Sequence, residues 1–146
     1  MRDELSNIAK EAERLTRLNP GDIVLDIGCN DKTLLAAYKS KGILRVGFDP
    51  VSRFKKEFNR KKEYFINDYF SFRKYNKLFP KSKAKIITAI AMFYDLDEPN
   101  EFVADVKKAL NKDGVFIIQQ NYLVEMFRQN AFDNIVHEHL EYYSLL

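Results

Sequence analysis

The sequence contains little cysteine or histidine and no long apolar run. Its 146 residues include one cysteine, Cys29, and two histidines. A single cysteine cannot close an internal disulfide. One cysteine and two histidines are also too few ligands for a typical structural zinc site, and we therefore expect no bound metal. No apolar stretch reaches the roughly 20 residues that cross a bilayer, and the charged N-terminus lacks a signal-peptide core. We therefore expect a cytoplasmic protein with no membrane partner.

The composition is that of a globular protein, with 46% hydrophobic, 14% aromatic and 31% charged residues. Because the length suits one core and neither repeats nor linkers interrupt it, we predict a single domain over residues 1–146. Residues 53–85 hold 12 basic and 3 acidic side chains, a net charge of +9, whereas residues 86–146 hold 4 and 10, a net charge of −6. The basic segment is typical either of a solvated surface or of one that binds nucleic acid or phosphorylated substrates.

Short apolar segments alternate with segments of helical periodicity. Strands are predicted over residues 22–27, 43–49, 63–66, 84–92 and 115–119. Helices are predicted over residues 5–18, 34–38 (closed by Gly42), 52–61 and 99–110, and a lysine-rich connection separates the third and fourth strands. This alternation indicates an α/β fold, a doubly wound, Rossmann-like and mostly parallel sheet of about five strands with helices on both faces.

The loop after the first strand, residues 26–32, lies where an open α/β sheet binds its ligand. A dinucleotide needs a glycine-rich turn around its pyrophosphate, but this loop has only Gly28 and carries carboxylates at Asp26 and Asp31. Flanking carboxylates favour a ligand with positive charge and no phosphate, such as S-adenosylmethionine. We expect Asp26, Gly28 and Asn30 to contact this cofactor.

Two more carboxylates end the next two strands. Asp49 follows Asp26 by 23 residues (49 − 26), close to the spacing of about 20 at which a carboxylate meets ribose hydroxyls. Asp68, followed by Tyr69, is placed to meet the adenine amino group. We expect all three residues in the cofactor site. Ordinary turn and capping chemistry is the alternative interpretation of these acids.

The order of the segments VLDIGCNDKTLL, VGFDP and NDYF resembles the class I S-adenosylmethionine-dependent methyltransferases. The segments AIAMFYDLDEPNEFVADVKKAL and FDNIVHEHLEYYSLL resemble, more narrowly, the nucleotide-sugar (NDP-hexose) C-methyltransferases, which methylate a carbon of a keto-sugar. The resemblance implies a small-molecule acceptor such as a nucleotide sugar. It also implies that the chain lacks the family's N-terminal zinc domain and C-terminal domain, and that the sheet stops before its sixth and seventh strands. Lys32 stands where the family usually has glycine.

Both histidines, His137 and His139, lie in one short stretch with Glu138. Forming a carbon–carbon bond with a sulfonium methyl requires a base that removes a proton next to a carbonyl, and histidine suits that role near neutral pH. The resemblance implies the same roles, His139 as general base with Glu138 beside it. We place His137 and Tyr94 in the substrate pocket. The alternatives are metal ligation, or capping and packing, for the histidines and core packing for Tyr94.

Two other functions remain open. One is a truncated cofactor-binding module that is inactive without a partner chain. The other is a nucleic-acid methyltransferase, which is disfavoured because residues 53–85 lack the regular aromatic spacing of a stacking surface. The apolar edge of the last strand needs cover, from the last 26 residues or from a second copy in a homodimer. We expect association, because a folded-back tail that buries Tyr142 and Tyr143 would draw His139 away from the cofactor.

Overall fold

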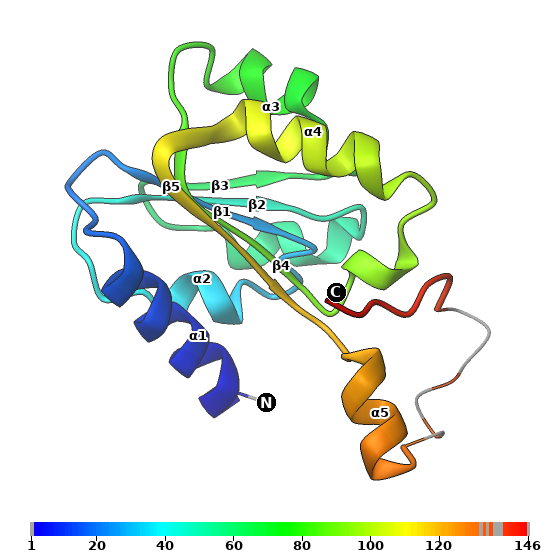
Figure 1. Ribbon diagram of the computed structural model, residues 1–146. Helices are drawn as coiled ribbons and strands as arrows, with labels where there is room; N and C mark the ends of the chain where they lie inside the picture. The colour runs from blue at the N-terminus through cyan, green and yellow to red at the C-terminus, as the bar shows by residue number, and fades with distance from the viewer. Residues whose placement is uncertain (1, 132, 134, 136–138, 146) are drawn as a thin grey trace.

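The computed structural model describes residues 2–131, 133, 135 and 139–145. Its centre is a parallel five-stranded sheet with the order β3-β2-β1-β4-β5 (Figure 1). The strands are β1 (Ile23–Ile27), β2 (Leu44–Phe48), β3 (Glu63–Ile66), β4 (Ala84–Ile90) and β5 (Leu110–Gln119). This topology confirms the predicted Rossmann-like α/β fold.

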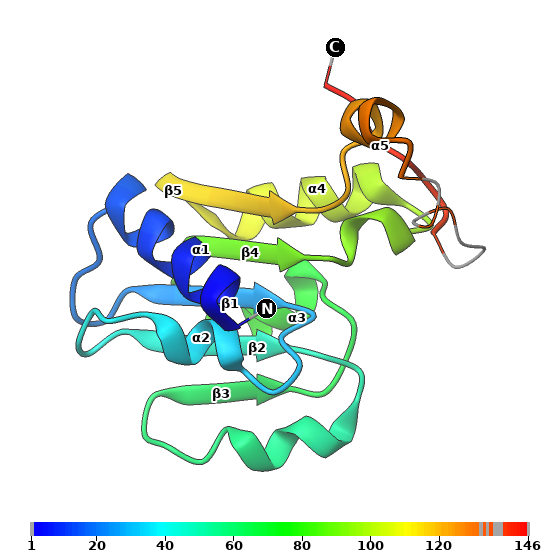
Figure 2. The same ribbon diagram turned by 90° about the horizontal axis from the view of Figure 1, so that it is seen from below.

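Helices cover both faces of the sheet. Figure 2 shows α1 and α2 in front of the sheet and α3 and α4 behind it. One apolar core lies between the sheet and the first pair, and a second core lies between the sheet and the other pair. The helices are α1 (Arg2–Leu15), α2 (Thr33–Ala37), α3 (Phe72–Leu78), α4 (Pro99–Ala109) and α5 (Leu123–Gln129), with short 3-10 helices η1 (Ser52–Glu57) and η2 (Phe93–Asp95).

The central strand β1 is buried along its whole length, because strands lie on both of its sides and helices on both of its faces. Its one charged residue, Asp26, lies opposite Gly47 of β2 and Thr88 of β4. All five strands run the same way, so the loops after β1, β2, β3 and β4 meet at one edge of the sheet. This carboxyl edge holds the sequence-predicted cofactor residues.

Several predicted elements differ from the structure. Gly42 does not close α2, which ends at Ala37; it turns with a φ of +78° against Pro20 instead. The predicted helix over 52–61 is the shorter 3-10 helix η1. The lysine-rich connection contains α3, whose first turn is capped by Ser71, and α5 was also not predicted.

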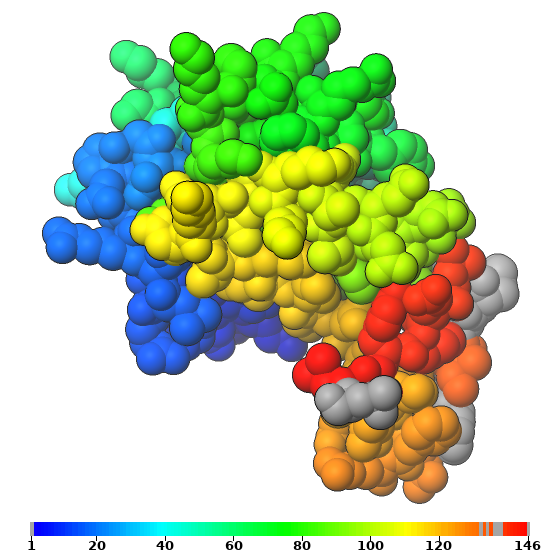
Figure 3. Space-filling model, turned by 45° about the horizontal axis from the view of Figure 1, so that its top comes forward, coloured from blue at the N-terminus to red at the C-terminus, as the bar shows by residue number. Residues whose placement is uncertain are grey.

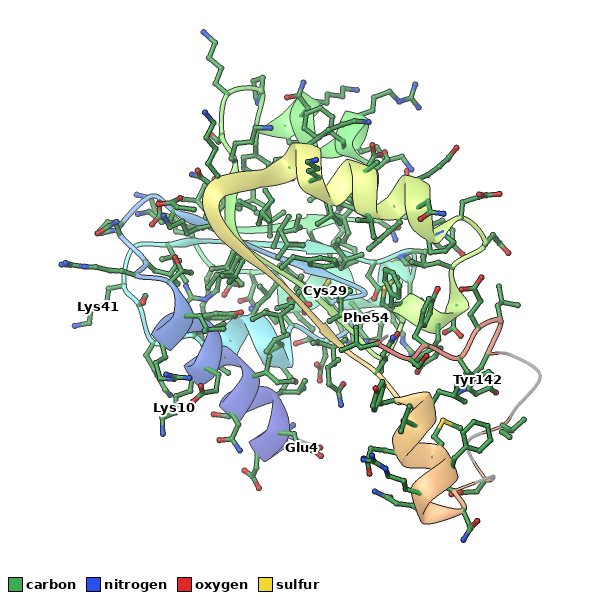
Figure 4. All side chains as sticks on the ribbon, in the orientation of Figure 1. Glu4, Lys10, Cys29, Lys41, Phe54 and Tyr142 are labelled. Atoms are coloured by element: carbon green, nitrogen blue, oxygen red, sulfur yellow. The ribbon has the colours of Figure 1, made fainter. Side chains whose placement is uncertain are left out.

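Gly47 provides a test of the packing between the sheet and the loop after β1. A Cβ atom at this position would lie 2.4 Å from Cys29 Sγ and 2.6 Å from the Phe58 ring. Cys29 is buried in the interior (Figure 4). We expect Gly47→Ala to lower the free energy of unfolding by about 1–3 kcal/mol, the usual cost of overpacking, as measured by denaturant unfolding. Partial recovery in the Gly47→Ala/Cys29→Ala double variant identifies the sulfur contact as a cause; an unchanged stability of Gly47→Ala contradicts the packing argument.

Candidate cofactor and acceptor site

The loop after β1 folds back over the end of β2. The backbone N–H groups of Gly28 and Cys29 both donate to the carbonyl of Phe48, at 2.9 and 3.1 Å. Gly28 has a φ of +76°, in the left-handed region that glycine adopts without steric cost. Asn30 and Lys32 also have positive φ values, of 46° and 58°. The loop therefore makes a tight turn that exposes backbone at the carboxyl edge.

Two cavities lie on either side of this turn, and Gly28 lines both. The larger, of about 280 Å³, is bordered by loops that follow β1 to β4; its lining residues are Ile27, Gly28, Phe48, Pro50, Asp68, Tyr69, Phe70, Met92, Asp95, Leu96 and Phe102. The smaller, of about 140 Å³, is lined by Leu5, Asp26, Gly28, Cys29, Asn30, Asp31, Thr33, Leu34, Ile90 and Ala91. Of the six residues predicted to bind the cofactor, five line one or both cavities.

Asp26 is buried, with 3% of its surface exposed, and its Oδ1 accepts a hydrogen bond of 2.6 Å from the Thr88 hydroxyl. Burial raises the pKa of its carboxyl from 3.8 to about 7, and the nearby Asp49 adds to the rise, while the Thr88 hydrogen bond opposes it. Asp26 is therefore a carboxyl group whose charge is sensitive to what occupies the neighbouring cavity. Thr88 was missed from the sequence, because only the register of β4 against β1 brings it there.

Asp49 is the sixth predicted residue, and it is not among the residues that line the two cavities. Its carboxylate accepts the backbone N–H groups of Asn30, at 3.0 Å, and Val51, at 2.8 Å. The Asn67 side-chain amide donates to the carbonyls of Asp49 and Pro50. Asp49 thus ties the loop after β1 to the loop after β2. The contact of Asp49 with ribose stays a prediction. The sequence reasoning missed Asn67, which supports the loop after β2; its place directly after β3 is the signal that indicates such a role.

Asp68 and Tyr69 follow β3 at the mouth of the larger cavity. Asp68 accepts the Tyr69 N–H at 2.8 Å and forms an ion pair of 2.6 Å with Lys74. The hydrogen bond from Lys74 holds the pKa of Asp68 below its usual value. The Tyr69 side chain is 74% exposed. An adenine amino group that binds Asp68 would therefore share this carboxylate with Lys74.

Tyr94 follows β4 and contacts the C-terminal tail (residues 139–145). Its ring centroid lies 4.2 Å from that of His139, and its carbonyl accepts the N–H groups of Leu140 and Glu141. Its hydroxyl donates to the carbonyl of Ala91 at 3.0 Å. Burial, and next the charge of Asp95, raise the pKa of Tyr94. His137 and Glu138 lie outside the described residues.

The position of this tail bears on the expected association. The tail does fold back, and the Tyr143 ring lies 5.2 Å from the Phe93 ring, yet His139 stays at the carboxyl edge beside Tyr94. The expectation concerned a tail that buries Tyr142 and Tyr143, whereas both side chains are only half-buried here. The position of His139 relative to the cofactor stays a prediction. Residues 139–145 form no helix. Association into dimers stays a prediction.

The basic segment is partly neutralised. Lys74 pairs with Asp68 and Lys85 pairs with Asp113, while Arg53 and several lysines around it are exposed. Lys32 pairs with the half-buried Glu63 at 2.5 Å. Within the described part of the chain, no group of three or more histidine, cysteine or acidic residues is placed to hold a metal. No described helix is both long and apolar enough to span a membrane.

This sheet order, with acidic loops around a single-glycine turn, is typical of a class I S-adenosylmethionine-dependent methyltransferase domain. The chain matches the family described as "Methyltransferase domain" over residues 2–146 and belongs to it.

A more specific likeness is to the C-methyltransferase NovU of Streptomyces niveus, with 29% identity over 129 residues. The match covers 88% of this chain and 31% of NovU, so the chain spans less than a third of the relative's length. Among solved structures, a putative methyltransferase in complex with the Haloferax volcanii Trm112 activator aligns at 17% identity with a TM-score of 0.71, over 99% of this chain and 65% of that one. The plantazolicin methyltransferase BpumL, in complex with a monoazolic desmethylPZN analogue and SAH, aligns at 16% identity with a TM-score of 0.66, over 95% of this chain and 54% of that one. These two likenesses confirm the fold.

Proposed function

We propose that this chain is the cofactor-binding and catalytic domain of a methyltransferase that transfers a methyl group to a carbon next to the carbonyl of a keto-sugar nucleotide or similar small molecule. The observation that carries the proposal is the contact between His139 and Tyr94 at the carboxyl edge of the sheet, where the loops after β1 to β4 border the larger cavity. The similarity to NovU supports transfer to carbon.

The two cavities suit S-adenosylmethionine. The smaller cavity, lined by Asp26 and Asp31, suits the positively charged methionine end, and the larger, mainly apolar cavity with Asp68 suits adenosine. Gly28 has no side chain between the two, so a ligand can lie close to the backbone there. S-adenosylmethionine supplies an electrophilic methyl group and leaves as S-adenosylhomocysteine.

The chain's own contribution to the chemistry is proton removal. In the proposal, the imidazole of His139 accepts the proton from the acceptor carbon, which leaves an electron pair on that carbon to form the new bond to the methyl group. Tyr94 supports the imidazole with its ring and the backbone of the tail with its carbonyl. Glu138 beside the base and His137 in the substrate pocket remain part of the proposal on sequence grounds.

Binding of S-adenosylhomocysteine tests the cofactor assignment. We expect calorimetric titration of the chain to show binding of S-adenosylhomocysteine and not of NAD, and Gly28→Ala to weaken that binding at least about tenfold, because a side chain at φ +76° strains the turn. The matched control is Gly21→Ala, which carries similar strain (φ +97°) between α1 and β1, away from the cavities. Tighter binding of NAD, or equal losses in the two variants, contradicts the assignment.

A further inference from the structure

A third cavity, of about 400 Å³, lies beyond the end of β5. Its walls are the end of β5, the connection to α5 and the C-terminal tail, and we call it the amide cavity. Figure 3 shows the tail, in red, against the yellow-to-orange segment that leads from β5 to α5. The lining residues are Ile118, Gln119, Gln120, Asn121, Tyr122, Tyr143, Ser144 and Leu145.

Backbone contacts hold the two walls of the amide cavity together. The Leu123 N–H donates to the Tyr143 carbonyl at 2.9 Å, and Tyr122 and Tyr143 form a parallel bridge. The Tyr143 ring also contacts Phe93, which is buried. Because main-chain bonds fix both walls, the cavity is formed before any ligand arrives, as ligand sites usually are.

The lining is uncharged, and its polar groups lie among a larger apolar surface that includes Ile118 and Leu145. Three consecutive amides, Gln119, Gln120 and Asn121, are joined by two phenols and the Ser144 hydroxyl, and no acidic or basic side chain takes part. Gln120 Oε1 is buried and has no hydrogen-bond partner among the described residues. Buried polar atoms in native proteins are rarely left without a partner, so this oxygen is available to an ordered water molecule, or to a ligand once the side chain turns towards the cavity. Rotation of the amide about its last torsion can present either a donor or an acceptor.

The amide cavity adjoins the cofactor site. The Ala91 N–H donates to the Gln119 carbonyl at 2.8 Å, and Ala91 lines the smaller of the two cavities beside Gly28. Ala91 has a φ of +51°, a strained conformation for a residue with a side chain, and such strain collects at functional sites. On its other side, the amide cavity borders the tail that carries His139. Within that tail, the His139 ring lies 6.0 Å from the ring of Tyr142, the neighbour of the lining residue Tyr143.

We propose that the amide cavity binds the neutral, polyhydroxylated ring of the acceptor and that Gln120 is a specificity-determining residue for it. This inference rests on the proposed function and refines it. Amides offer both donors and acceptors to hydroxyl groups, and the tyrosine rings offer apolar faces to the ring carbons. The diphosphate of a nucleotide sugar binds outside this cavity, because its lining contains no arginine or lysine to pair with phosphate.

Two probes test the subsite. We expect methyl α-glucoside at millimolar concentration, without any cofactor, to shift the NMR side-chain amide signals of Gln119, Gln120 and Asn121. With S-adenosylhomocysteine present, we expect Gln120→Leu to weaken dTDP-glucose binding at least about tenfold and to leave dTDP binding unchanged. The matched control is Asn76→Leu, which removes an exposed amide on α3.

The outcomes separate this inference from the proposed function. Amide signals that do not move with the glucoside overturn the subsite, as does a wild-type chain that binds S-adenosylhomocysteine but not dTDP-glucose. Equal losses of dTDP-glucose and dTDP affinity in Gln120→Leu also overturn it, because they place the effect outside the sugar ring. Failure of S-adenosylhomocysteine to bind, with the glucoside shifts intact, contradicts the proposed function and leaves the sugar subsite supported.

Discussion

Replacing His139 with asparagine is expected to abolish methyl transfer while leaving the affinity for S-adenosylhomocysteine nearly unchanged. Asparagine keeps a polar side chain beside Tyr94 but cannot accept the proton, so only the transition state loses an interaction. General-base catalysis contributes about 10²- to 10⁴-fold, so a loss of at least that size is expected. The measurement is the formation of S-adenosylhomocysteine with a keto-sugar nucleotide as acceptor.

Deuterium exchange isolates the proton-transfer step from methyl transfer. With S-adenosylhomocysteine bound in place of the methyl donor, the wild-type chain should exchange the acceptor's α-proton with deuterated solvent, and His139→Asn should not. His137→Asn is the matched control and should have the smaller effect on both readouts. Equal losses in the two variants favour a shared structural role for the histidines, and normal exchange in His139→Asn removes this residue from the role of base.

The fold could be predicted from the sequence because burial on both faces makes the central strands short, mainly apolar segments, each with a single charged residue. The strand predicted over 63–66 coincides with β3, and those predicted over 22–27, 43–49 and 84–92 overlap β1, β2 and β4 within two residues. Helix α3 was missed although Phe72, Tyr75 and Phe79 recur at helical spacing and pack into the core, because the lysines and the arginine between and around them gave the segment the composition of a loop. The first helix lies three residues earlier than predicted, at Arg2–Leu15.

The site was predictable only in part. Parallel strands end at one edge, so acids that follow successive strands had to gather there, and Asp26, Asp49 and Asp68 do. The sequence could not show that Asp49 holds backbone N–H groups, since that depends on how the two loops cross. Nor could it place His139 against Tyr94, because that contact depends on the path of the tail over the loop after β4.

The pH dependence of stability is expected to reveal Asp26. Burial raises the pKa of its carboxyl in the folded chain from 3.8 to about 7. Between about pH 4 and pH 7, the Asp26 carboxyl has lost its proton in the unfolded chain but still holds it in the folded chain, so folding takes up a proton. The stability that this group contributes is complete below about pH 4 and is lost as the pH rises to about 7. At about 1.4 kcal/mol for each pH unit, the total is on the order of 4 kcal/mol.

Other carboxyl groups act in the opposite direction, so the effect must be measured as a difference. The pKa of Asp31 is lowered, chiefly by its hydrogen bond from Thr33, and groups of this kind lose stability as the pH falls. Subtracting the unfolding free energy of Asp26→Asn from that of the wild type at each pH cancels these contributions. Asparagine retains an oxygen that accepts the Thr88 hydroxyl, so the variant is expected to fold.

We expect this difference to fall steadily between about pH 4 and pH 7 in the chain without ligand, as measured by urea unfolding at constant ionic strength. S-adenosylmethionine should flatten the slope, because its positive charge beside Asp26 favours the ionised carboxylate and so lowers the pKa of this group in the complex. Its binding near pH 6 should therefore release a proton, which calorimetry in buffers of different ionisation enthalpy detects. A difference that is flat with pH shows that Asp26 is ionised in the folded chain. A slope that the cofactor leaves unchanged shows instead that the methionine end binds elsewhere.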